Sequence, residues 1–192
     1  MKKRLTAETA ETAERKTSRI LGALGVLGGK TDYKHKMFTD ADALALIARL
    51  RPARQTVVFT NGVFDLLHPG HVRYLQHARA LGEALIVGIN SDRSVQANKG
   101  PNRPVTPERE RAEILAALTC VDAVVIFDEE IPHAVIARLQ PDVLVKGADW
   151  AADAIIGRDI VEARGGKVVR VPVEPGYSTT AIMEKIRSTR QV

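Results

Sequence analysis

From about residue 39 onward, short continuous hydrophobic runs alternate with longer amphipathic segments. The continuous runs are rich in Val, Ile and Leu, which is typical of strands that are buried on both faces of a sheet. They lie at residues 56–60, 84–90, 122–127, 142–146 and 167–171. Helices are expected between them, at residues 69–81, 106–118, 130–139 and 151–164, with a last one at 179–188.

This alternation predicts an α/β fold with a doubly wound, Rossmann-like parallel sheet of five strands. One more helix is expected before the first strand, since Thr39 suits an N-cap and Pro52 ends the amphipathic pattern. Ligands of such sheets bind beyond the carboxyl ends of the strands. The residues that follow each strand are therefore the first candidates for a functional site.

The net charge of +5 is confined to the start of the chain. Residues 1–36 hold nine Lys or Arg against four acidic residues, so the basic and acidic residues of the remainder cancel. We interpret residues 1–36 as a flexible basic extension and residues 37–192 as the folded domain that carries the motifs described below. Because the body is neutral, its charge gives no reason to expect binding of nucleic acid.

Cysteine content and hydropathy favour a cytoplasmic protein. Cys120 is the one cysteine, which excludes an intramolecular disulfide framework and fits a reducing compartment. No apolar run approaches the length of a membrane span, so no membrane association is expected. The weakly apolar residues 20–27 contain two glycines and follow several glutamates, which argues against a secretory signal.

The most informative motif is the ten-residue run from Gly62 to His71, directly after the first strand. Pro69 suits the first helical position, which makes His68 the expected N-cap and places His71 in the first turn. A single histidine at a helix start is usually a capping or surface residue. Two imidazoles beside the positive end of a helix, however, can donate hydrogen bonds to a phosphoryl group during its transfer.

Three other segments carry candidate chemistry. The run from Lys146 to Trp150 follows the fourth strand and offers a cation, a glycine, a carboxylate and an indole. Ser178 is expected to cap the last helix beside neighbouring hydroxyls, which together form an anion site. The loop after the second strand supplies Lys99 and Arg103, and the next helix supplies Arg109 and Arg111, as cations for nucleotide phosphates.

These motifs resemble a known family. The string G-x-F-D-x-x-H-x-G-H is similar to that of cytidylyltransferase-like nucleotidyltransferases. Together with four later runs, it resembles the heptose 1-phosphate adenylyltransferases of ADP-heptose synthesis, over about residues 38–188. The later runs are residues 90–92, 102–105, 146–149 and 177–180. Related cytidylyltransferases often carry an Arg before the last of these runs, which residues 173–180 lack.

The resemblance implies transfer of AMP from ATP to D-glycero-β-D-manno-heptose 1-phosphate, which yields ADP-heptose for the inner core of lipopolysaccharide. Magnesium would be held mainly by the nucleotide phosphates, with no metal site of the protein's own. The partners would be small-molecule substrates, and a homodimer is a family-level expectation. Two alternatives remain open: a cytidylyltransferase for glycerol 3-phosphate or another small phosphorylated acceptor, and an inactive nucleotide-binding regulatory module on the same fold.

The resemblance also assigns residues to roles. The catalytic residues would be His68, His71 and Lys99. The nucleotide-binding residues would be Thr60, Asn61, Gly62, Val63, Phe64, Asp65, Asn90, Arg103, Arg111, Tyr177, Ser178, Thr179 and Thr180. The acceptor-binding residues would be Lys146, Gly147, Asp149 and Trp150. Asp65 is expected to brace the turn rather than act as a base.

Overall fold

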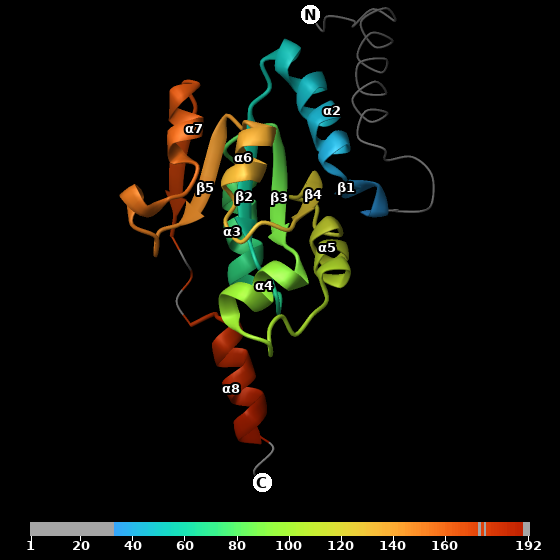
Figure 1. The fold of residues 1–192 in the computed structure, drawn as a ribbon, viewed down its shortest axis with the longest axis vertical. Helices are drawn as coiled ribbons and strands as arrows, with labels where there is room; N and C mark the ends of the chain where they lie inside the picture. Colours follow the sequence, from blue (N-terminus) through green and yellow to red (C-terminus); the bar gives the residue numbers. More distant parts are fainter. Residues whose placement is uncertain (1–32, 173, 175, 190–192) are drawn as a thin grey trace, which may run out of the picture. The chain divides into compact units, whose positions relative to one another are not determined.

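The computed structural model describes residues 33–172, 174 and 176–189. Its centre is a parallel sheet with the strand order β1-β4-β3-β2-β5-β6 (Figure 1). The strands are β1 (Met37–Phe38), β2 (Val57–Gly62), β3 (Ala84–Asn90), β4 (Ala123–Phe127), β5 (Val143–Gly147) and β6 (Lys167–Val171). The order runs outward from β2 in both directions, so the switch point of the sheet lies between β2 and β5.

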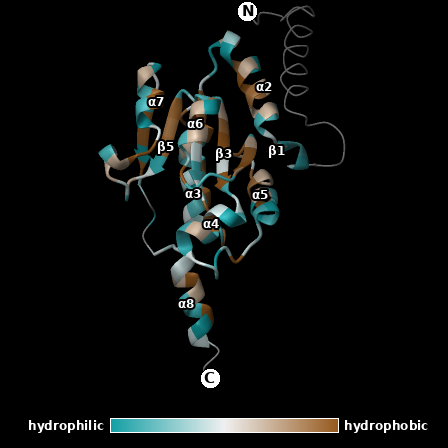
Figure 2. Ribbon diagram, in the orientation of Figure 1, coloured by the Kyte–Doolittle hydropathy of each residue, from teal (hydrophilic) through white to brown (hydrophobic). Residues whose placement is uncertain are grey.

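Helices cover both faces of the sheet. They are α2 (Asp40–Leu50), α3 (Pro69–Arg79), α4 (Asp92–Lys99), α5 (Glu108–Ala116), α6 (His133–Leu139), α7 (Arg158–Ala163) and α8 (Thr179–Thr189). The apolar residues of α3 and α5 pack on one face of the sheet, and those of α2, α6 and α7 pack on the other. The buried strands are correspondingly the most hydrophobic elements (Figure 2).

The predicted fold class is confirmed, but the sheet has six strands rather than five. The additional strand β1 spans two residues, and Met37 and Phe38 pair with Val124 and Val125 of β4. Two residues are too few to give a hydrophobic pattern, so this strand forms because β4 offers it an open edge.

The packed domain includes part of the segment that the sequence assigned to the basic extension. Tyr33–Lys36 forms a 3-10 helix. The Tyr33 hydroxyl donates to Glu113 of α5 at 2.8 Å, and Lys36 Nζ donates to the carbonyl of Leu118 at 3.1 Å. The remainder of the predicted extension, residues 1–32, lies outside the described residues.

Two predictions of secondary structure were wrong in detail: the loop after β3 and the helix at residues 151–164. The segment after β3, interpreted as a loop, contains α4, which Ser91 caps through the backbone N–H of Ser94. The segment 151–164 contains a 3-10 helix (Ala152–Ala154) and the short α7, because Gly157 turns the chain at φ 84° between them.

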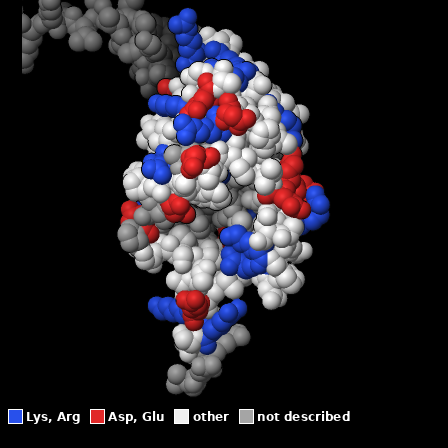
Figure 3. Space-filling view, turned by 60° about the vertical axis from the view of Figure 1, so that its left-hand side comes forward, with Lys and Arg blue, Asp and Glu red and all other residues white. Residues whose placement is uncertain are grey.

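On the face drawn in Figure 3, basic and acidic side chains are interspersed, so this face is neither uniformly positive nor uniformly negative. Within the part of the chain that the structure describes, no helix is long and apolar enough to cross a membrane.

Candidate active site

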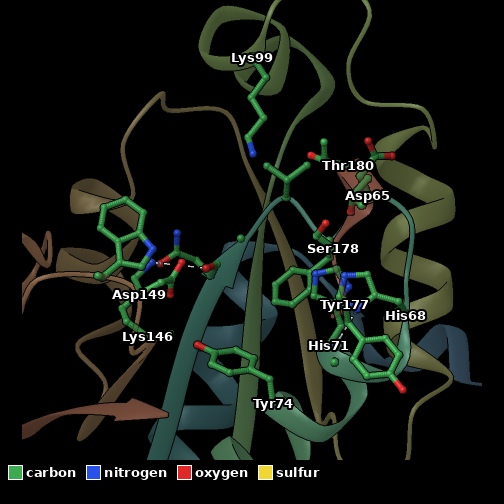
Figure 4. A pocket seen from close by; sticks show the side chains of 18 of the residues that line it. Asp65, His68, His71, Tyr74, Lys99, Lys146, Asp149, Tyr177, Ser178 and Thr180 are labelled. Atoms are coloured by element: carbon green, nitrogen blue, oxygen red, sulfur yellow. Dashed lines mark hydrogen bonds between the residues drawn. The ribbon is translucent and has the colours of Figure 1, made fainter. Parts of the chain in front are cut away.

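A cavity of about 420 Å³ opens at the switch point, beyond the carboxyl ends of β2 and β5 (Figure 4). Its walls come from the β2–α3 turn, the first turn of α3, the end of α4, the segment after β5 and the start of α8. The lining residues are Asn61, Gly62, Val63, Phe64, Asp65, His68, Gly70, His71, Tyr74, Lys99, Arg103, Lys146, Gly147, Asp149, Trp150, Tyr177, Ser178, Thr179 and Thr180. Most of the predicted site residues therefore meet in one place.

The turn between β2 and α3 is built around Phe64. Its backbone lies in the left-handed region at φ 48°, which is uncommon for a residue other than glycine. The ring then folds back over Gly62, where an added β-carbon would lie 3.1 Å from Cε2 of Phe64. The same ring meets His71 edge to face, with centroids 5.2 Å apart. Gly62 and Phe64 thus fix the position of His71.

His68 and His71 form a stacked pair at the N-terminus of α3, as predicted. Their ring centroids lie 3.8 Å apart, and the ring planes differ by 15°. His68 Nδ1 accepts the backbone N–H of His71 at 3.4 Å, so it caps the helix and holds its own proton on Nε2. Nδ1 of His71 is buried and has no hydrogen-bond partner.

The pair is uncharged at neutral pH. Burial and, to a smaller extent, the neighbouring His68 lower the pKa of His71 to about 4. Burial also lowers the pKa of His68. Desolvation and like-charge repulsion both disfavour the imidazolium form, so each ring has one N–H to donate, while the acceptor nitrogen of His68 is used by the helix cap.

Lys146 spans the switch point from the end of β5. Its ammonium group donates to the side-chain oxygen of Asn61 on β2 at 2.5 Å, and it lies 5.8 Å from the ring centre of Trp150. Only 7% of Lys146 is exposed, and burial lowers its pKa to about 8 although the carboxylate of Asp149 acts in the opposite direction. The cavity therefore holds a desolvated cation with a single neutral partner.

Asp65 is buried, and its carboxylate stabilises the β2–α3 turn. Its carboxylate accepts the backbone N–H groups of Val105 and Thr106 at 2.9 Å and forms an ion pair with Arg103 Nε at 2.8 Å. Asp65 therefore ties the loop that follows α4 to the β2–α3 turn, as a brace and not as a base. The backbone N–H of Thr106 thus serves this brace, and α5 begins after Pro107 without a side-chain cap.

The start of α8 forms the wall opposite Lys146. Ser178 Oγ accepts the backbone N–H of Ala181 at 3.0 Å, which is the expected cap. Tyr177 stacks on His68 at 6.2 Å, and an added β-carbon at Gly70 would lie 3.0 Å from Cβ of Tyr177. The glycine of the histidine motif thus lets the α8 segment approach the imidazole pair.

A second cavity of about 410 Å³ adjoins the first and shares Asn61, Gly62, Val63, Lys99, Lys146 and Trp150 with it. Its remaining lining is Asn90, Val95, Asn98, Glu130, Ile131, Pro132 and Ile156. Of these, only Asn90 was predicted from the sequence. The sequence did contain a signal for α4, because Ser91 can cap a helix, Asp92 suits the first turn and Gly100 suits the position after the last turn. Recognising that helix would also have directed attention to Asn98.

Three residues that were predicted to bind nucleotide or phosphate lie outside both cavities, and one of them, Arg109, is exposed on α5. Arg111 is 1% exposed, and its guanidinium donates to the carbonyls of Val63, Asn90 and Thr106 and to the carboxylate of Asp92. It therefore ties together the β2–α3 turn, the end of β3 and the segment before α5, and the prediction that it contacts phosphate is wrong. Thr60 is fully buried and contacts Tyr74 instead.

Lys99 also differs from its prediction in one respect. It is the last residue of α4 and not part of a mobile loop. Its side chain lines both cavities and extends toward the space between Lys146 and the start of α8 (Figure 4). Tyr74, which was not among the predicted site residues, lines the base of the first cavity.

The fold, the switch-point cavity and the imidazole pair define a nucleotidyltransferase of the Rossmann-like type. The chain belongs to the cytidylyltransferase-like family, which it matches over residues 59–191.

Among curated proteins, the chain is similar to the bifunctional protein HldE of several bacteria. It is 55% identical to that of Citrifermentans bemidjiense over 149 residues (77% of this chain and 31% of the relative). It is 50% identical to that of Geobacter sulfurreducens over 170 residues (88% of this chain and 34% of the relative). The chain thus spans about a third of the length of the relatives it matches.

A solved structure of similar fold is that of the lipopolysaccharide core biosynthesis protein from Thermoplasma volcanium. The two chains are 28% identical, and the TM-score is 0.52 over 62% of this chain and 97% of the other.

Proposed function

We propose that this chain transfers AMP from ATP to D-glycero-β-D-manno-heptose 1-phosphate and releases pyrophosphate. The observation that carries the transfer chemistry is the stacked His68–His71 pair facing Lys146 across one cavity at the switch point. The likeness to the bifunctional HldE proteins and to a lipopolysaccharide core biosynthesis protein supports heptose as the acceptor. The product would then serve the synthesis of the lipopolysaccharide inner core.

In the proposed reaction, an oxygen of the acceptor phosphate attacks the α-phosphorus of ATP while the bond to the bridging oxygen of pyrophosphate breaks. The nucleophile is already an anion, so neither a general base nor a covalent enzyme intermediate is required. Catalysis is then positioning together with stabilisation of developing charge. His68 and His71 would donate their N–H groups to the α-phosphate and the bridging oxygen.

The cations and the α8 terminus would hold the leaving phosphates. Lys99 extends into the cavity from the end of α4, and Arg103 lies beside Asp65 at its edge. Ser178, Thr179 and Thr180 supply hydroxyls and free backbone N–H groups at a helix N-terminus, which suits an anion. We expect the nucleotide phosphates between these groups and the imidazole pair.

The acceptor would lie on the side of Lys146, Gly147, Asp149 and Trp150. Lys146 can neutralise the phosphate of the acceptor, and its desolvation strengthens that attraction. Trp150 is 48% exposed and borders both cavities, so its ring can contact the apolar face of a sugar.

The protein provides few ligands for a metal ion at this site. Among the described residues no three His, Cys, Asp or Glu side chains gather as a metal site, and Asp65, one of the two carboxylates that line the cavity, is engaged by Arg103 and backbone N–H groups. A divalent ion such as magnesium would accordingly bind to the nucleotide phosphates and offset their charge. We place the reaction in the cytoplasm, where its phosphorylated substrates are found, and propose a homodimer as the assembly.

Pyrophosphate release with defined substrate pairs tests the proposal. We expect kcat/KM for ATP with heptose 1-phosphate to exceed that for CTP with glycerol 3-phosphate by about a thousandfold, because a polar pocket rejects ligands that leave its groups unpaired. A preference for the second pair would replace the substrate and leave the transfer chemistry in place. Nucleotide binding without pyrophosphate release from any pair would favour the regulatory module.

A further inference from the structure

Tyr74 has a hydrogen-bond arrangement that fixes what its hydroxyl can do. The residue projects from α3 into the base of the first cavity (Figure 4). Its hydroxyl oxygen lies 2.7 Å from Thr60 Oγ1 on β2, and Thr60 Oγ1 lies 3.0 Å from the carbonyl oxygen of Val145 on β5. Thr60 is fully buried, so no water is available to it.

Counting protons gives the direction of this chain of hydrogen bonds. A threonine hydroxyl has one proton, and here the geometry directs it to the carbonyl of Val145. Tyr74 must then donate its own proton to Thr60. The reverse direction would leave the contact between Thr60 and Val145 without a proton and make one hydrogen bond fewer in a buried place. The phenol oxygen consequently presents only lone pairs to the cavity.

The groups around Tyr74 also favour a protonated phenol whose oxygen acts as a hydrogen-bond acceptor toward the cavity. Burial, which outweighs the opposite effect of the hydrogen bond with Thr60, and the carboxylate of Asp149 together raise the pKa of Tyr74 to about 12, so the phenol keeps its proton at physiological pH. Asp149 lines the same cavity and is itself an acceptor. The nearby cation Lys146 donates to the Asn61 side chain. Tyr74 and Asp149 therefore offer hydrogen-bond acceptors beside this cation, whereas the wall at His71 and Ser178 offers donors.

We propose that Tyr74 is a specificity residue that accepts a hydrogen bond from an uncharged O–H or N–H group of a bound substrate, and that Thr60 sets this polarity. The inference rests on the proposed function and deepens it. The donor belongs either to the nucleotide, as a ribose hydroxyl or the adenine amino group, or to the sugar, as a hydroxyl. A phosphate oxygen is rejected at this place because it has no proton to donate.

Calorimetric binding to the Tyr74→Phe variant tests the inference without any need for turnover. The ligands are ATP, 2′-deoxy-ATP, 3′-deoxy-ATP, ITP and heptose 1-phosphate. We expect the variant to bind the ligand that carries the donor about tenfold more weakly, the scale of one hydrogen bond. The analogue that lacks that donor should bind equally to both proteins. An effect on heptose 1-phosphate alone would identify the sugar as the source.

Two substitutions of Thr60 form a matched pair. Thr60→Ser keeps the hydroxyl and should keep the wild-type selectivity. Thr60→Val removes it and frees the proton of Tyr74, so an analogue with fluorine or a carbonyl oxygen in place of the donor should bind several-fold more tightly than it binds to the wild type.

Wild-type affinities of Tyr74→Phe for all five ligands would overturn the inference, and so would unchanged selectivity of Thr60→Val. Either result leaves the proposed function intact. A wild-type protein that binds neither ATP nor heptose 1-phosphate would instead overturn the proposed function, and the inference with it. Melting temperatures of the variants separate lost binding from lost folding.

Discussion

His68 and His71 lie face to face at 3.8 Å, and burial holds the pKa of His71 at about 4. A phosphate that enters the cavity supplies the opposite charge that this pair lacks, and an opposite charge at hydrogen-bond distance raises the pKa of an imidazole. Binding of an anionic substrate is thereby linked to protonation of the pair.

The first prediction follows from this linkage. Binding of ATP at pH 6 should take up a fraction of a proton, and the uptake should decline toward pH 8 because fewer protons are available to the imidazoles. Calorimetry in buffers of different ionisation enthalpy measures it directly. The uptake should be reduced in a His71→Asn variant, and equal uptake in both proteins would assign the proton to another group.

Loss of the His71 ring should affect catalysis far more than stability. We expect His71→Ala to lower kcat at least about a hundredfold, the scale for removal of one preorganised donor to a developing anion. His77 lies on the same helix, is exposed and does not line the cavity, so His77→Ala is the matched control. Near-wild-type turnover of His71→Ala would remove this residue from the catalytic group.

The buried ammonium group of Lys146 should lower the stability of the folded protein, although the proposed reaction needs it. Its folded pKa of about 8 lies below the usual lysine value of 10.5, so the folded state disfavours the charged form at pH 7. We expect Lys146→Met to raise the free energy of unfolding at pH 7 by roughly 1–3 kcal/mol and to abolish transfer.

The pH dependence of this stability difference checks its cause. As pH rises from about 8 toward 10.5, the folded wild type loses its proton before the unfolded chain does, so its stability rises toward that of the variant. Denaturant titrations at pH 7 and pH 10 measure both proteins. A Lys146→Met variant less stable than the wild type at pH 7 would show that the ammonium group stabilises the fold.

Arg111 should be structural. Its removal leaves three carbonyls, one of them buried, and the carboxylate of Asp92 without this donor, so Arg111→Met should destabilise the protein by about 3–5 kcal/mol. Arg109 is exposed on the same helix, and Arg109→Met should change stability by no more than about 0.5 kcal/mol. Equal effects of the two substitutions in chemical denaturation would contradict this role.

Truncation tests where the domain begins. We expect removal of residues 1–32 to leave activity and melting temperature nearly unchanged. Removal of residues 1–36 should lower the melting temperature, because it deletes the hydrogen bonds of Tyr33 to Glu113 and of Lys36 to Leu118. A loss of solubility or assembly in the shorter truncation would assign a role to residues 1–32.

Much of the fold and site could be predicted because local rules and the strand-end rule agree. Each long buried strand carries a continuous apolar run, and Thr39, His68 and Ser178 cap the helices expected of them. Because the carboxyl ends of parallel strands meet at one edge, residues that follow β2 and β5 were expected together. The contact between Asn61 and Lys146 fulfils that expectation.

What the sequence did not reveal depends on long-range contacts. Strand β1 exists because β4 has an open edge, and Arg111 is buried because it donates to carbonyls of three segments that are far apart in the sequence. Nothing in the residues around Arg111 distinguishes it from the exposed Arg109. Similarly, the role of Tyr74 depends on Thr60, fourteen residues earlier and on another element.

The contact between Asn61 and Lys146 also has a consequence for synthesis of the chain, because it joins residues 85 positions apart. The start of α8 lies further still along the sequence. Parallel pairing over such separations forms slowly, because the entropy of closing the loop is lost before any stabilising contact forms. A chain leaving the ribosome therefore exposes its histidine motif well before it has a place for a nucleotide. Binding capacity should appear only with the last third of the polypeptide, in a single late step.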